Sequence, residues 1–259
     1  MNSYPLISVI LPTYLRNDLV VNAIKSIQNQ TYLNKEILVV DDSPSREFSK
    51  IANNFPDVVV LYTEGKGAPT ARNAGILAAK GDYIAFLDDD DEFLPEKLEA
   101  HWQAMKSSSL PVSYSWARLV GPDGSERDYC PRYSGQILDM LLVYNFIGTQ
   151  VLVCEREWLL KNELFFDPDL RKFQDWDLVI RLAEKSSIAL VSKILVKVHK
   201  HEGQRISTNE RTPHGVIYTK YRKQARRLKV LALHLAYLIK SRRLDIFKSY
   251  WRAVWQSKT

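Results

Sequence analysis

Four consecutive carboxylates, Asp88–Asp91, directly follow an apolar run that ends at Leu87. Adjacent carboxylates repel one another, by roughly 4 kcal/mol for a pair ~4 Å apart at an effective dielectric constant of about 20. A fold keeps such a cluster at a strand end where solvent, a helix N-terminus or a divalent cation offsets the charge. We favour the cation. The alternative is a solvated acidic start of the next helix, which Glu92 and Glu96 would also serve.

The chemistry that suits such a cluster is the binding of a hard divalent cation. Mg²⁺ and Mn²⁺ take a few carboxylate oxygens and can complete their coordination with phosphate oxygens of a ligand. A divalent ion placed in this way stabilises negative charge that grows on its ligand as a bond breaks. The calcium-loop pattern of EF-hand proteins, with its glycine and closing glutamate, is absent here.

Short apolar runs that indicate buried strands recur through the first third of the chain. Strands are predicted over residues 6–11, 36–40, 58–62 and 82–87. Between them, apolar residues at helical spacing follow Asp18, which we expect to cap a helix, and a second helix is predicted over residues 70–79. The alternation predicts an α/β fold with a mostly parallel sheet that helices cover on both faces. Ligands of such sheets bind beyond the carboxyl ends of the strands, where residues 12–14, Asp41–Asp42 and the four carboxylates would gather.

A loop with two glycines, residues 65–73, precedes or opens the second predicted helix. Its glycines permit close approach of the backbone to a ligand, and a helix N-terminus favours an anion. The loop lacks the Gly-Lys-Ser/Thr ending of a P-loop, and no GxGxxG follows the first strand. A dinucleotide-dependent oxidoreductase is therefore disfavoured.

Four motifs in order carry a resemblance to a known family. They are Ser8-Val9-Ile10-Leu11-Pro12-Thr13-Tyr14, Val39-Val40-Asp41-Asp42-Ser43, Ala71-Arg72-Asn73-Ala74-Gly75-Ile76 and Phe86-Leu87-Asp88-Asp89-Asp90-Asp91. Through them the chain resembles the family 2 glycosyltransferases of GT-A fold, from about Ser8 to Ser207. The resemblance implies inverting transfer of a sugar from a nucleotide-diphosphate sugar, with a UDP-sugar as first choice, helped by Mn²⁺ or Mg²⁺ at a DxD motif.

The same resemblance implies roles for individual residues. The DxD motif is Asp88-Asp89-Asp90, with Asp90 as the first choice of direct metal ligand and Asp88 as a ligand of the metal or of the ribose. Asp89 is grouped with the nucleotide-binding residues by its place in the motif. Asp42 matches the acid that recognises the nucleotide base. The positions that line the base and the diphosphate match Pro12, Tyr14 and Arg72.

A fifth motif, Phe173 to Leu182, resembles the family segment that carries the general base. An acceptor hydroxyl must lose its proton as it attacks the anomeric carbon, and a carboxylate held opposite the leaving group is sufficient for this step. Asp175 is our choice of base and Asp177 is the rival. A simple helix cap is the alternative role for Asp175. Gln174 stands where Glu is commoner in the family, which puts the role of a second acid in doubt.

A loop after the strand predicted over residues 188–198 resembles the closing loop of the family, in which a histidine reaches the diphosphate or the metal. His201 fits this position better than His199, and a surface histidine is the alternative. We therefore group His201 with Asp90 and Asp88 as candidate metal ligands.

The middle of the chain differs in character and contains no sharp motif. Its predicted elements are a hairpin of strands over 112–120 and 126–130, a helix over 137–144 and a strand over 149–154. In the family this half receives the acceptor. We therefore divide a catalytic domain, residues 1–212, into a nucleotide-sugar half, 1–98, and an acceptor half, 99–212.

Charge sets the C-terminal segment apart. Residues 213–259 hold twelve Lys and Arg residues and one acid, a net charge of +11, whereas the other 212 residues hold 24 basic and 29 acidic residues, a net charge of −5. Apolar residues recur there at helical spacing, which predicts a basic, amphipathic, helical extension. Such helices fit an anionic membrane surface, and docking on the catalytic domain or self-association are the alternatives. No recognition motif accompanies the charge, so nucleic acid is disfavoured.

Two cysteines without a CxxC pair fit a reducing compartment, and no apolar run has the length of a signal peptide or a membrane span. We expect a cytoplasmic protein, with a peripheral place on the inner face of the membrane if the basic segment binds lipid. The predicted function is an inverting, metal-dependent glycosyltransferase that acts in polysaccharide or lipid-linked glycan assembly. The competing hypotheses are a non-catalytic nucleotide-sugar-binding and membrane-anchoring module of the same fold, and a sugar-phosphate nucleotidyltransferase.

Overall fold

The computed structural model describes residues 4–170, 172–200 and 215–226, together with residues 230, 233 and 237. The strands are β1 Ile7–Thr13, β2 Lys35–Asp41, β3 Val58–Tyr62, β4 Tyr83–Phe86, β5 Glu92–Phe93, β6 Val112–Val120, β7 Glu126–Tyr129, β8 Leu152–Glu155 and β9 Ala189–His199. The α-helices are α1 Asn17–Gln28, α2 Ala68–Ala78, α3 Lys97–Ser108, α4 Leu138–Leu141, α5 Arg156–Lys161, α6 Gln174–Lys185, α7 Gly215–Lys220 and α8 Arg222–Ala225. Short 3₁₀ turns are η1 Glu47–Lys50, η2 Ala52–Asn54 and η3 Thr149–Val151.

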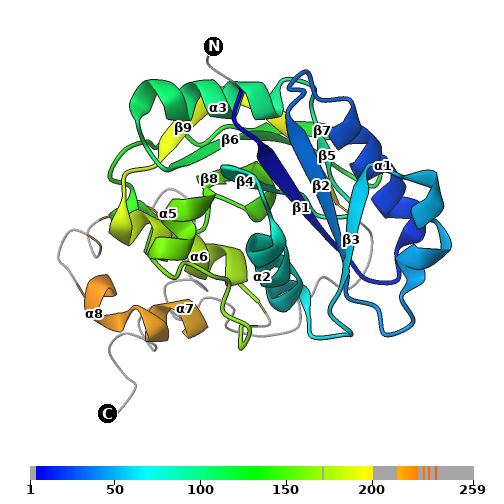
Figure 1. Ribbon diagram of the computed structural model, residues 1–259. Coiled ribbons are helices and arrows are strands. Elements are labelled where there is room, and N and C mark those ends of the chain that lie inside the picture. Colours follow the sequence, from blue (N-terminus) through cyan, green and yellow to red (C-terminus); the bar gives the residue numbers. More distant parts are fainter. Residues whose placement is uncertain are drawn as a thin grey trace.

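The described strands form one curled sheet in the order β3-β2-β1-β4-β8-β6-β9-β5, with β7 paired to β6. Helices cover it, with α2 and α6 on one side and α3 on the other (Figure 1). The strands β3, β2, β1 and β4 run parallel, and β8 joins them to the second half through antiparallel pairs with β4 and β6. The predicted α/β class is confirmed, and the two predicted halves of the catalytic domain share this sheet.

The central strand β1 positions the candidate site. All seven of its residues are buried, because it has parallel neighbours on both edges and helices on both faces. The chain leaves β1 towards β2 and β3 on one side, and then returns to β4 on the other side. Such a reversal opens a crevice at the carboxyl ends of the two strands, where ligands of α/β sheets bind. The ends of β1 and β4, with the four carboxylates, meet at this point.

Close packing of α2 on the sheet brings the helix N-terminus to the same edge. A Cβ atom on Gly75 would lie 2.5 Å from Cγ2 of Ile10 in β1, so any larger residue would push the helix outward. The helix begins after Gly67, whose positive φ of 92° favours glycine. Arg72 therefore lies on a helix that is seated directly on the central strand.

Several predicted boundaries are wrong in detail. Asp18 lies in the first turn of α1, whose N-cap residue is Arg16 without a side-chain cap bond. The predicted strand over 149–154 begins as the η3 turn, and only β8 pairs with neighbours. The two-residue strand β5 lies between the carboxylates and the next helix, α3, and it pairs with β9. A strand this short leaves no periodic signal in the sequence.

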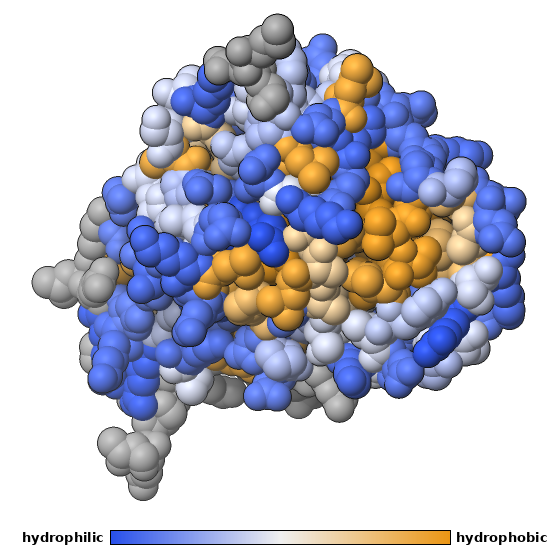
Figure 2. Space-filling model, viewed as in Figure 1, coloured by the Kyte–Doolittle hydropathy of each residue, from blue (hydrophilic) through white to orange (hydrophobic). Residues whose placement is uncertain are grey.

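The surface shows apolar area on the face that carries α2 and β3 (Figure 2). Val59 on β3 and Leu77 on α2 are exposed members of those two elements. Among the helices of the described residues, none has the length and apolar character needed to cross a membrane.

Candidate active site

The acidic cluster is held by one polar side chain from the end of β1 and one from the residue before α1. Thr13 Oγ1 donates to Asp89 Oδ2 at 2.9 Å. The Nη1 atom of Arg16 lies 3.2 Å from Asp89 Oδ1 and 3.3 Å from Asp90 Oδ2. The Arg16 side chain is half exposed, so its guanidinium sits over the cluster from the solvent side. The guanidinium of Arg16 therefore contacts two carboxylates of the predicted DxD motif, those of Asp89 and Asp90.

Two members of the cluster are buried, and this changes their acidity. Burial raises the pKa of Asp89 to about 6, against the lowering effects of Arg16 and Thr13. Burial and repulsion by the neighbouring acids raise the pKa of Asp91 well above its ordinary value, although the backbone N–H of His199 donates to its Oδ1 at 2.9 Å. Both carboxyl groups are therefore harder to ionise than an exposed aspartic acid.

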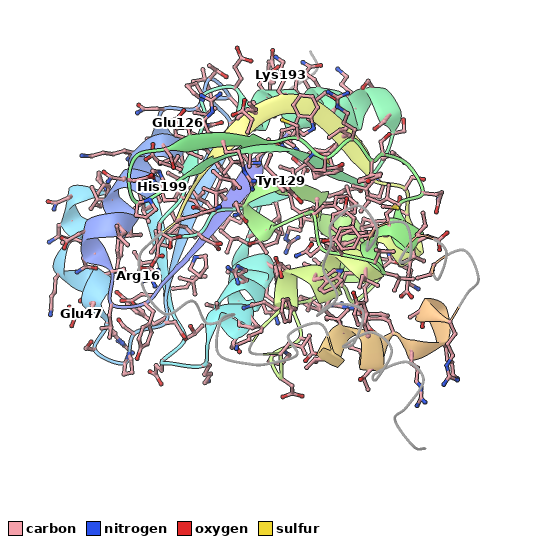
Figure 3. All side chains as sticks on the ribbon, turned by 180° about the vertical axis from the view of Figure 1, so that it is seen from behind. Arg16, Glu47, Glu126, Tyr129, Lys193 and His199 are labelled. Atoms are coloured by element: carbon pink, nitrogen blue, oxygen red, sulfur yellow. The ribbon has the colours of Figure 1, made fainter. Side chains whose placement is uncertain are left out.

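The end of β9 closes the other side of the cluster. The His199 imidazole Nε2 lies 3.1 Å from Glu92 Oε1, in addition to the backbone bond to Asp91. Arg16, at the start of α1, and His199, at the end of β9, lie on the same side of the molecule (Figure 3). The predicted ligand His201, two residues further on, lies outside the described residues.

Arg72 connects the acidic cluster to the helix of the predicted base. Its Nη2 atom donates to Asp88 Oδ1 at 2.5 Å, and its Nη1 atom donates to Gln174 Oε1 at 3.0 Å. The guanidinium carbon lies 5.4 Å from the centroid of the Phe166 ring. The residue is 6% exposed, and its Nε atom has no hydrogen-bond partner among the described residues. A buried, always charged group with an unused donor is suited to an anionic ligand at this position.

Asp175 lies in the first turn of α6 and faces the same region. The Asn145 side-chain amide donates to its Oδ2 at 3.0 Å, and the backbone N–H of Trp176 donates to its Oδ1 at 2.8 Å. Burial raises the pKa of Asp175, and the charges of Arg72 and Asp88 also act on it. Its carboxyl group is therefore close enough to Asp88 of the predicted DxD motif to interact with it electrostatically.

Asp177, the rival base, points elsewhere. Its carboxylate is fully buried and is bonded to Arg181, Lys220 and Tyr221. Arg181 lies on α6 itself, Lys220 is the last residue of α7, and Tyr221 directly follows it. With its oxygens engaged in this cluster, Asp177 has a structural part in the described chain.

Asp42 is buried at the end of β2 and holds the glycine-containing loop. Its Oδ1 accepts bonds from Thr63 Oγ1 at 2.6 Å and from the Lys66 backbone N–H at 2.9 Å, and its Oδ2 accepts one from the Gly67 backbone N–H at 2.7 Å. Of the other residues expected to line the base, Pro12 is buried in β1 and Tyr14 is 49% exposed. The structure therefore brings Asp42 and the loop together at the edge where the nucleotide is predicted.

The donor chemistry of the cluster fits Mg²⁺ or Mn²⁺, which favour carboxylate oxygens. No group of three or more His, Cys, Asp or Glu side chains among the described residues is gathered tightly enough to hold a metal ion unaided. Guanidinium groups occupy the neighbourhood instead, with Arg72 on Asp88 and Arg16 on Asp90. Asp88 and Asp90, whose carboxylates bond these two arginines, are the residues predicted to bind the metal. Asp90 and Asp88 would hold it, with diphosphate oxygens completing the coordination.

Three residues at the site had no role assigned in the sequence analysis. Thr13 lies within the first motif, between Pro12 and Tyr14, and Arg16 follows two residues after the end of that motif. Asn145 comes from an irregular segment with no signal in the sequence, and only folding brings it to Asp175.

Comparison with known proteins identifies the class of enzyme that this fold and site define. Residues 8–154 match the family described as glycosyl transferase family 2, so the chain belongs to this family and is a glycosyltransferase. A protein of Escherichia coli (strain K12), described as the putative colanic acid biosynthesis glycosyl transferase WcaA, is 30% identical over 270 residues, covering 98% of this chain and 93% of that protein. The putative teichuronic acid biosynthesis glycosyltransferase TuaG of Bacillus subtilis (strain 168) is 27% identical over 215 residues, covering 81% and 84%.

A solved structure shares the fold. The crystal structure of S. aureus TarS 1-349 in complex with UDP-GlcNAc aligns with a TM-score of 0.71 at 17% identity, covering 96% of this chain and 81% of that chain. The resemblance on which the sequence analysis relied is thereby confirmed for the family and for the GT-A fold.

Proposed function

We propose that this glycosyltransferase moves a sugar, with inversion at the anomeric carbon, from a nucleotide-diphosphate sugar to an acceptor hydroxyl. A UDP-sugar is the proposed donor, and Mn²⁺ or Mg²⁺ the proposed cofactor. The observation that carries the proposal is the link through Arg72, which bonds Asp88 of the DxD motif and Gln174 beside Asp175. Arg72 thus lies between Asp88, proposed to act on the leaving group, and the helical turn that carries the proposed base, Asp175.

Each group has a task in this reaction. Arg72 binds the diphosphate and offsets its charge as the bond to the sugar breaks. Asp90 and Asp88 would hold the divalent ion, which would stabilise negative charge on the leaving diphosphate when bound. Asp175 accepts the proton of the acceptor hydroxyl, because its carboxylate is oriented by Asn145 and is not neutralised by a bonded cation in the described contacts.

The acceptor is proposed to be a growing polysaccharide or a lipid-linked glycan. Support comes from the descriptions of the two relatives, which name colanic acid and teichuronic acid biosynthesis. Contact of residues 213–259 with an anionic membrane surface is part of the same proposal and rests on their net charge of +11. Flotation of the protein with vesicles of phosphatidylglycerol, but not of phosphatidylcholine, is the expected result.

The central test is a donor screen. Purified protein is incubated with a panel of UDP-, GDP- and dTDP-sugars, with Mn²⁺, Mg²⁺ or EDTA, and release of nucleoside diphosphate is measured. We expect one UDP-sugar to be turned over with Mn²⁺, activity to be lost in EDTA and in Asp90→Ala, and Asp175→Asn to lower the rate by about 10³-fold. Full activity in EDTA would exclude the metal, and retention of the anomeric configuration in the product would exclude inversion.

A further inference from the structure

The start of the C-terminal segment packs against the helix that carries Asp175. The helices α7 and α8 lie beside α6 (Figure 1). Their inward side chains, Ile217, Tyr218, Tyr221 and Ala225, are each buried. Tyr218 contacts Trp176 edge to face, with ring centroids 5.9 Å apart, and its hydroxyl donates to the Val143 carbonyl at 2.8 Å. The segment is therefore built into the core of the domain at this point.

A buried carboxylate lies at the centre of this contact. Asp177 is 0% exposed and accepts a bond from Arg181 Nε at 2.9 Å. The Tyr221 hydroxyl donates to Asp177 Oδ1 at 2.8 Å, and Lys220 Nζ lies 2.7 Å from the same oxygen. A buried carboxylate is costly unless it is paired and fully hydrogen-bonded. Of the three side-chain partners it has among the described residues, two come from the C-terminal segment.

The carboxylate shares its helical turn with the proposed base. Asp177 is two residues from Asp175, and its backbone N–H donates to the Phe173 carbonyl at 2.9 Å to close that first turn. Trp176, between the two acids, is fixed by Tyr218 and by a bond from its Nε1 to the Leu141 carbonyl at 2.6 Å. Both neighbours of Asp175 on its C-terminal side are thus held by the α7–α8 segment.

We propose that Tyr221 and Lys220 are positioning residues of the transferase, which act through Asp177 to set the first turn of α6 and with it the carboxylate of Asp175. The inference rests on the proposed function in taking Asp175 as the base. It also implies that residues 215–225 are part of the catalytic unit, so that a chain ending at residue 212 lacks a component of the active site.

The test combines single and double variants in the full chain. Tyr221→Phe removes one hydroxyl and keeps the ring, Lys220→Met removes the charge, and Lys220→Arg should restore it. Lys223→Met, on the exposed side of α8, is the matched control. The assay is release of UDP from the UDP-sugar that the donor screen selects, with Mn²⁺ and water as the acceptor. The rate constant and the KM for donor are measured for each variant.

We expect Tyr221→Phe and Lys220→Met each to lower kcat by about 10-fold, with donor KM changed less than about twofold, because a small displacement of a catalytic group costs rate more than ground-state binding. Lys220→Arg should recover most of the rate, and Lys223→Met should retain the wild-type rate. In an Asp175→Asn background, Tyr221→Phe should have no further effect, because its target is already absent.

Two results would overturn the inference while the proposed base stands. One is a wild-type kcat in both Tyr221→Phe and Lys220→Met while Asp175→Asn is inactive. Asp175 would then remain the proposed base, but the two residues would have no positioning role. The other is an equal loss from Tyr221→Phe with and without Asp175, which would mean a general effect on folding. A wild-type rate in Asp175→Asn itself would instead remove the proposed base, and the inference with it.

Discussion

Arg72 and Asp88 form an ion pair 2.5 Å long at the edge of the sheet, although they are 16 residues apart in the sequence. The second terminal nitrogen of the same guanidinium reaches Gln174, 102 residues further along the chain. A planar group with donors on two sides can make both bonds at once, whereas a lysine ammonium on a flexible stem cannot match that geometry.

Arg72→Lys should therefore lower kcat/KM by about 10- to 100-fold even though the charge is kept. The loss is expected because lysine can keep only one of the bonds to Asp88 and Gln174. Its positive charge would also lie at a different distance from the diphosphate. Steady-state kinetics on the selected donor measures it. Arg156→Lys, whose partner Glu157 is its neighbour on α5, is the control and should behave as wild type. An unchanged kcat/KM in Arg72→Lys would exclude a bidentate role.

Arg16 should compete with the divalent ion for the acidic cluster. Its guanidinium lies 3.3 Å from Asp90 Oδ2, the first choice of metal ligand. Arg16→Gln removes the competing charge, so we expect Mn²⁺ to bind about tenfold more tightly in the absence of donor. Electron paramagnetic resonance of free Mn²⁺ during a titration measures this directly, and Asp90→Ala should show weak binding. Weaker Mn²⁺ binding in Arg16→Gln would mean that Arg16 supports the site instead.

Asn145 should set the pH dependence of the reaction. Its amide donates to the Asp175 carboxylate and so lowers a pKa that burial raises. Asn145→Ala removes this stabilisation of the charged form, so the pKa of Asp175 rises further. A general base works only when ionised, so the acid limb of the kcat profile should move to higher pH.

A pH profile from 4 to 9 checks the direction of this change. Asn162→Ala, where the amide bonds the Trp158 carbonyl on α5, is the matched control and should leave the limb in place. Movement of the limb to lower pH in Asn145→Ala would contradict the role of Asp175 as base.

A buried lysine away from the site should limit stability. Lys97 is 0% exposed at the start of α3, with its ammonium nitrogen 3.2 Å from His101 Nε2 and 4.8 Å from the Phe93 ring centroid. Burial lowers the pKa of Lys97 to about 7. The folded chain thus binds fewer protons than the unfolded chain between pH 7 and about 10.5, so stability from this group rises with pH across that window.

Lys97→Met should raise the free energy of unfolding at pH 7, on the order of 3 kcal/mol, and the advantage over wild type should shrink as the pH approaches 10. Thermal or denaturant unfolding at several pH values measures it. Lys106→Met, on the exposed side of the same helix, should change stability little. A destabilised Lys97→Met at pH 7 would show that the bond to His101 outweighs the burial of the amine.

The ends of elements were harder to predict than their existence. The strands β1 to β4 were predictable because parallel strands buried on both faces need continuous apolar residues. Asp18 looked like a cap because local sequence alone favours it there, yet the helix begins one residue before it, after Arg16. The strand β5 exists only because β9 lies beside it, and no local pattern records a partner so distant in sequence.

The amino-acid sequence by itself determined the α/β class and the family, because these depend on periodicity and on motifs that are continuous in the chain, and it singled out Asp88–Asp91 and Asp175 as candidate site residues. The tertiary structure decided which of those acids are buried, which cations lie on them, and that Asp177 is bonded to Lys220 and Tyr221. Partners such as Arg16, Asn145 and Tyr221 are separated from their targets by long stretches of chain. Only the packing of strands and helices brings them within hydrogen-bond distance, and pKa values follow from that packing.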